Sequence, residues 1–286
     1  MIQQNPFSLY DFLGYLIPGS LLIFLIMFLQ TTNFENIDNL TLSNLFYTCH
    51  KFEIEQFTFF VIISYCVGHL VNFVSSLIIE RYANWRYGYP SKYLLNLTPK
   101  NHSYWGPKKD KMKKVWRFIT AIVIFPITIC DLFLGSILRF RFFYTRPLDE
   151  FLREVIKDKG EKLINKLHIR KQGLSTTRID NFDFNRIFTH YTFENSKRHQ
   201  GKLTNYVVLY GFLRSLTFIC IILFWYSLIQ STNIITWNIT IILGFISYVY
   251  FMAFMKFYRR YTLENLMIIA IDNDPDLIIK TEIDKS

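Results

Sequence analysis

The chain is poor in charged residues and in glycine, and it lacks the motifs that mark the common enzyme classes. Only 19% of its 286 residues are charged and only 11 are glycine, whereas 51% are apolar. A soluble domain carries about 25% charged residues. No Gly-rich phosphate-binding loop, GxSxG or HExxH motif occurs. We therefore expect no cofactor and no catalytic residues, and we disfavour an enzyme without excluding one.

Cysteine is also scarce and has no ligand spacing. None of the four cysteines forms a CxxC pair, and three of them lie in apolar runs, where cysteine packs as a small hydrophobe. His190, Glu194 and His199 do not form a chelating set, because His199 falls on the opposite face of a helix from His190. The sequence thus predicts neither a disulfide framework nor a metal site.

The chain instead contains apolar blocks that are long enough to cross a bilayer. A helix needs about 20 apolar residues to cover the roughly 30 Å of hydrocarbon. Such blocks run over residues 11–30, 57–79, 118–138, 206–228 and 239–257. They predict an all-α integral membrane protein. The start of the chain has no basic region and no cleavage site, so we expect the first block to remain as an anchor.

The charge is distributed unevenly between these blocks. Residues 81–116 hold nine Lys/Arg against one Asp, and residues 139–203 hold fifteen against eight acids, whereas residues 31–56 hold one Lys against four acids. Basic loops stay on the cytoplasmic side of a membrane. We therefore expect the acidic connector outside, both basic segments inside, and cytoplasmic N- and C-termini.

The block at 118–138 does not fit a simple crossing. Pro126 and Asp131 interrupt it, and basic segments flank both of its ends. A complete crossing would leave one basic segment outside, against the charge rule. We therefore predict a re-entrant or partly inserted broken helix, with irregular backbone covered by protein or water.

These observations predict four transmembrane helices in two hairpins plus the broken helix and a helical basic cytoplasmic region. Residues 1–80 form the first transmembrane hairpin, and residues 81–203 form the basic region that contains the block at 118–138. Residues 204–258 form the second hairpin, and residues 259–286 form a cytoplasmic tail. Within the basic region, apolar residues at three- and four-residue steps predict an amphipathic helix over 148–167.

Arg214 lies inside the fourth apolar block, where an unpaired charge is costly. Snorkelling towards the interface, a buried ion pair and a functional gate are three interpretations. Asp11 and Asp131 are the candidate partners, since both would lie at comparable depth, and Asp11 is the first choice.

Other polar residues suggest contacts or ligand binding. His69 and Asn72 are three residues apart on one helix face, which predicts a polar helix contact or a proton relay. The basic segments favour contact with anionic lipid or an acidic ligand, and nucleic acid is disfavoured because the basic residues adjoin apolar blocks. The residues assigned to this contact are Lys108, Lys109, Lys111, Lys113, Lys114, Arg139 and Arg141.

Three segments resemble uncharacterised polytopic bacterial inner-membrane proteins: YDFLGYLIPG at 10–19, GHLVNFVSSLIIER at 68–81 and NYVVLYGFLRSL at 205–216. Some proteins of that appearance look like transmembrane effectors of anti-phage defence systems. The resemblance implies a multimer that disrupts the membrane when a cytoplasmic partner signals infection.

The sequence therefore favours a non-enzymatic, oligomeric membrane effector or signalling component. It would alter membrane integrity when its cytoplasmic region receives a protein or nucleotide signal. The alternative is a channel or transporter subunit that uses the polar residues of the apolar blocks: Arg214, Asp11, Asp131 and His69.

Overall fold

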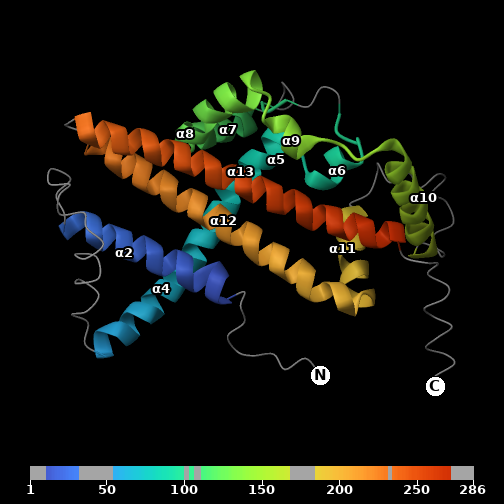
Figure 1. The fold of residues 1–286 in the computed structure, drawn as a ribbon, viewed down its shortest axis with the longest axis horizontal. Coiled ribbons are helices and arrows are strands. Elements are labelled where there is room, and N and C mark those ends of the chain that lie inside the picture. The colour runs from blue at the N-terminus through green and yellow to red at the C-terminus, as the bar shows by residue number, and fades with distance from the viewer. Residues whose placement is uncertain are drawn as a thin grey trace. The chain divides into compact units, whose positions relative to one another are not determined.

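The structure is a computed structural model that describes residues 11–31, 54–99, 103–105, 111–167, 184–230 and 234–271. Every regular element in these ranges is a helix (Figure 1). The prediction of an all-α protein is therefore confirmed for the part of the chain that is described. The acidic connector that supports the expected orientation falls mostly outside these ranges.

The chain forms two compact units, which are described separately. The first unit comprises Met1–Arg86, Ser103–Arg141 and Val207–Phe257. The second unit comprises Tyr87–His102, Phe142–Tyr206 and Tyr258–Ser286. The long helices α12 (Lys197–Ile229) and α13 (Ile234–Ile271) contribute residues to both units.

The first unit begins with a π-helical turn, η1 (Phe12–Leu16), which leads into α2 (Ile17–Thr31). Helix α2 crosses α4 (Ile54–Ser75) (Figure 1). Two glycines lie where the backbones of η1 and α2 meet that of α4. A Cβ on Gly19 would lie 1.8 Å from the backbone oxygen of Ser64, and one on Gly68 would lie 1.9 Å from the backbone oxygen of Tyr15. Glycine at these positions therefore allows the two backbones to approach closely.

Helix α4 continues through η3 (Ser76–Glu80), a π-helical segment, into α5 (Arg81–Tyr87). The apolar core next to this stretch joins α2, α4 and α12. Its buried residues are Leu22, Val71, Leu216, Ile219 and Leu223. Large apolar side chains on two helices of this unit stay exposed: Phe59 and Phe73 on α4, and Ile241 and Phe245 on α13.

The predicted break near Pro126 is confirmed. Helix α7 (Lys111–Val123) is followed by α8 (Phe125–Cys130) and the π-helical η4 (Asp131–Ile137), with a bend of 91°. Proline has no N–H and its ring clashes with the preceding turn, so Pro126 begins a new helix. The indole N–H of Trp225 donates to the Val123 carbonyl at 2.8 Å, which satisfies a backbone group at the break.

Within the described ranges, three helices are long and apolar enough to cross a membrane: Ile54–Leu94, His199–Ile229 and Thr236–Ile271. The bent pair would make a fourth if it counted as one span, whereas the helix at Phe12–Met27 is apolar but shorter. These helices fit a multi-pass membrane protein. The two-hairpin arrangement stays a prediction.

The second unit surrounds a separate apolar core. It contains α6 (Pro90–Leu94), α10 (Glu150–Leu167) and α11 (Phe184–Asn195), together with α9 (Arg141–Thr145) from Phe142 onwards. The amphipathic pattern predicted over 148–167 is confirmed, because Ile156, Leu163 and Ile164 of α10 are buried in this core. The Lys159 ammonium donates to the Ala270 carbonyl at 2.8 Å and links α10 to α13.

Candidate functional site

Arg214 on α12 is only 7% exposed and is held by three groups from the α4–η3 helix. Its guanidinium forms an ion pair with Glu80, donates to Asn72 Oδ1 at 2.7 Å and donates to Ser75 Oγ at 3.3 Å. Glu80 is the last residue of η3. A π-helical turn stacks residues five apart, so it brings Glu80 over Ser75 and onto the face that meets Arg214.

The predicted pairing of Arg214 with Asp11 is wrong. The carboxylate that contacts the guanidinium belongs to Glu80. Similar depth along two apolar blocks does not make two residues neighbours, whereas Glu80 lies on the helix that packs directly against α12. Because Asn72 and Ser75 line the same face, the guanidinium has hydrogen-bond acceptors in addition to the carboxylate.

Asp131 is not a partner of Arg214 either, because it pairs with Arg86. The Arg86 Nε donates to Asp131 Oδ2 at 2.8 Å, and its Nη2 donates to Ser136 Oγ at 3.1 Å. Asp131 is 1% exposed and begins η4, so Ser136 again lies five residues along a π-helical segment. A Cβ on Gly135 would lie 2.2 Å from Asp131 Oδ1, so glycine leaves room for the carboxylate.

The two ion pairs share one helical stretch. Glu80 and Arg86 lie on η3 and α5, and each binds an oppositely charged residue on a different element, Arg214 on α12 and Asp131 on η4. Burying a charge is favourable only when it is paired and hydrogen-bonded. We therefore take these two pairs, with Asn72, Ser75 and Ser136, as the candidate functional site.

His69 and Asn72 have different surroundings although they are on one helix. Asn72 forms the predicted polar helix contact, since it accepts from Arg214. His69 stacks on the Tyr15 ring at 3.8 Å and meets the Tyr65 ring edge-on at 4.6 Å. The structure does not bring His69 to either ion pair, and its role as a relay stays a prediction.

The basic residues assigned to lipid or ligand contact are mostly on the surface. Lys111, Lys113, Arg139 and Arg141 are exposed, and Lys114 is half-buried. Lys108 and Lys109 fall outside the described residues. Within the described ranges, no three His, Cys, Asp or Glu residues lie close enough together to hold a metal ion.

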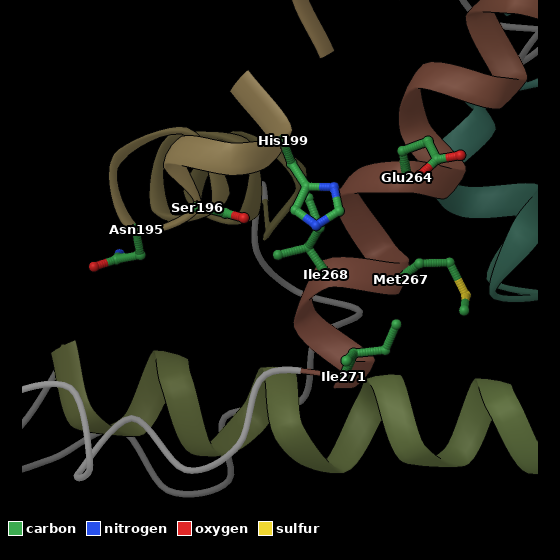
Figure 2. A pocket seen from close by; sticks show the side chains of 7 residues that line it. All are labelled: Asn195, Ser196, His199, Glu264, Met267, Ile268 and Ile271. Carbon is green, nitrogen blue, oxygen red and sulfur yellow. The ribbon is translucent and has the colours of Figure 1, made fainter. Parts of the chain in front are cut away.

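The second unit has a pocket of about 360 Å³ between the start of α12 and the end of α13 (Figure 2). Asn195, Ser196 and His199 line one side, and the opposite side is apolar apart from Glu264. The Glu264 carboxylate accepts from Lys202 Nζ at 2.8 Å. The other residues that line the pocket are Met267, Ile268 and Ile271. This volume lies at the low end of the range for small-molecule pockets.

Glu80 and Arg86 are the site residues that the sequence did not reveal. Both lie just after the apolar block at 57–79, close to Arg81, where a charge is usually interpreted as lying at the membrane interface. The five-residue step from Ser75 to Glu80 would place the two residues on one face only in a π-helical turn. On a regular α-helix the same step does not indicate a shared face.

Protein-family models, curated proteins and solved structures were compared with the chain, and none of them matches it.

Proposed function

We propose that this protein is a non-enzymatic, oligomeric membrane effector that alters membrane integrity when its second unit receives a signal. The Arg214–Glu80 pair is the observation that supports this function most directly. A charged pair packed between apolar helices is expensive to bury, and charges at membrane depth usually serve a function.

The two ion pairs would act as a latch between two arrangements of the first unit. In the latched arrangement, Glu80 and Arg86 hold α12 and η4 to the α4–η3–α5 stretch. Separating either pair leaves buried charges without compensation, which favours an arrangement in which water reaches them. A leaky or conducting membrane is the consequence of that second arrangement.

Helix α12 carries one residue of the candidate functional site and one residue that lines the pocket of the second unit. Arg214 of the latch and His199 of the pocket belong to this one helix, and Lys202 next to the pocket pairs with Glu264. A cytoplasmic protein or nucleotide that displaced this salt bridge would act on the helix that carries Arg214. In keeping with the resemblance to anti-phage effectors, we place this function in defence at the bacterial inner membrane, with both termini cytoplasmic.

Controlled expression in bacteria tests the latch. Glu80→Gln removes the charge that compensates Arg214, so we expect faster growth arrest and greater uptake of a membrane-impermeant dye than for the unmodified protein at equal abundance in the membrane. Glu55→Gln is the matched control, because Glu55 is an exposed carboxylate at the start of the same helix α4. Unchanged dye uptake for Glu80→Gln at equal abundance would contradict the proposal.

A channel or transporter subunit is the second candidate, and the Arg86–Asp131 pair favours it. Arg86 of α5 binds Asp131 and Ser136 of η4, and η4 belongs to the arm that follows the 91° bend after α7. Interrupted helices of this kind line ion sites. Asp11 and His69 belong to this alternative as further polar residues. Purified protein in liposomes would then carry a selective ion flux that Asp131→Asn abolishes, without dye leakage.

A further inference from the structure

Helix α7 has the reverse of the polarity expected for a helix on the surface of a soluble protein. Its side towards the rest of the first unit carries Arg117, which is half-buried, and Thr120, which is only 3% exposed. Its outward face carries Val115, Phe118 and Ile122, which are 58%, 56% and 46% exposed. A helix that faces water shows the opposite order.

The orientation of α7 is set by specific contacts of Arg117. Its guanidinium donates to the Tyr104 carbonyl and lies 5.1 Å from the centre of the Trp85 ring, and the Tyr104 hydroxyl donates to the Arg117 carbonyl. Burial raises the pKa of Tyr104 to about 12, so this hydroxyl remains a donor at neutral pH. These contacts hold the apolar face outwards.

The bend determines that α7 and α8–η4 cannot cross a bilayer as one straight rod. The two arms meet at 91°, so both cannot follow the membrane normal. Helix α7 has 13 residues, or about 20 Å at 1.5 Å per residue, which is shorter than the roughly 30 Å of hydrocarbon. The α8–η4 arm contains no basic residue, whereas α7 begins with Lys111, Lys113 and Lys114.

We infer that α7 lies in the plane of an anionic bilayer surface and binds lipid headgroups. Its apolar face enters the boundary between headgroups and acyl chains, and the three lysines contact phosphate groups. Amphipathic helices with this pattern of apolar and basic residues bind membranes in this way. The α8–η4 arm then enters the hydrocarbon. The inference rests on the proposed membrane location but not on the effector activity.

Depth measurements along α7 test its orientation. Single cysteines at Val115, Ile119 and Ile122, which share one face, are spin-labelled in full-length protein that otherwise lacks cysteine. The protein is placed in vesicles of zwitterionic lipid with 30% phosphatidylglycerol. We expect equal depths, whereas a helix along the normal would show a difference of about 10 Å between Val115 and Ile122. Labels at Ile129 and Ile137 on the other arm should differ in depth.

Lipid charge tests the role of the lysines. The triple variant Lys111→Gln, Lys113→Gln, Lys114→Gln should move the α7 labels outwards in the anionic vesicles and have no effect in purely zwitterionic ones. A depth gradient along α7, or spin–spin coupling between copies in place of lipid contact, would overturn the inference. The second result would show that another copy of the chain covers this face. Because depth is measured without leakage or toxicity, failure here is distinguishable from failure of the proposed function.

Discussion

At the level of single residues, a π-helical turn determines which carboxylate Arg214 meets. In a regular α-helix, residues three, four and seven apart share a face, so Glu80 would not lie over Ser75. The η3 segment changes this relation and brings the carboxylate to the guanidinium. The same five-residue step aligns Asp131 and Ser136 around Arg86, so both ion pairs depend on π-helical backbone.

A double-mutant cycle on Arg214 and Glu80 tests this pairing. We expect Arg214→Gln to lower the free energy of unfolding by about 3 kcal/mol, the low end for a buried pair, because the Glu80 side chain is 27% exposed. The double variant with Glu80→Gln should lose less than the two single losses combined. Unfolding of the purified protein in mixed micelles with increasing denaturing detergent provides the measurement.

Asp11 supplies the control for that cycle. Arg214→Gln and Asp11→Asn should be additive to within about 0.5 kcal/mol, because the guanidinium contacts Glu80 rather than Asp11. Coupling of Arg214 to Asp11 without coupling to Glu80 would show that the Arg214–Glu80 pair is not the one that stabilises the protein.

At the level of helices, the α2–α4 crossing depends on two glycines that touch the opposite backbone. Backbone atoms cannot rotate away as a flexible side chain can, so a methyl group at Gly19 or Gly68 must push the helices apart. Loss of this crossing would also disturb the stacking of Tyr15 on His69, which lies one residue beyond Gly68.

Alanine substitutions at two helical glycines test this crossing. Gly68→Ala should lower the free energy of unfolding by about 1–3 kcal/mol, as overpacking does in well-packed cores. Gly211→Ala on α12 is the matched control, since a Cβ there meets nothing within 4 Å. Alanine favours helices over glycine, so the control should be neutral or more stable by up to about 1 kcal/mol. Equal effects at both positions would refute the close crossing.

The break between α7 and α8 shows how a helix can stop inside an apolar unit. A carbonyl left without its helical donor is costly in an apolar environment. Here Trp225 donates to Val123, and the Thr128 hydroxyl lies 3.4 Å from the Ala121 carbonyl and 3.3 Å from the Ile124 carbonyl. The break is therefore supported by side chains from both α12 and α8.

At the level of the whole molecule, the charge distribution predicts the orientation of the chain. The basic segment at 81–116 follows the apolar block at 57–79, and the basic segment at 139–203 follows the broken block at 118–138. The connector between α12 and α13 contains no charged residue. With the first unit in the membrane, both termini would lie in the cytoplasm and residues 231–233 would lie outside.

Reporter fusions test this orientation. Alkaline phosphatase, which is active only outside the cytoplasm, should be inactive when fused after residue 286 and active when inserted at residues 231–233. Green fluorescent protein, which matures in the cytoplasm, should show the reverse. Active phosphatase at the C-terminus would invert the proposed topology and would place the pocket of the second unit on the outer side.

The sequence by itself determined the helical class, the apolar blocks and the interruption at Pro126. It also predicted the amphipathic helix over 148–167 and placed Asn72 at a helix contact. These features depend on local composition and on the α-helical period, and both can be read from consecutive residues. They were enough to place Arg214 inside an apolar block, with a buried ion pair as one of three interpretations.

Only the tertiary structure decided which partner that is. Glu80 lies 134 residues from Arg214 along the chain, and Arg86 lies 45 residues from Asp131. Both contacts depend on which helices pack against each other, and on a local change from α- to π-helical winding. The partners expected for Arg214 were chosen by depth along the apolar blocks, and the helical period assumes uniform α-helix, so neither criterion detected the true pairs.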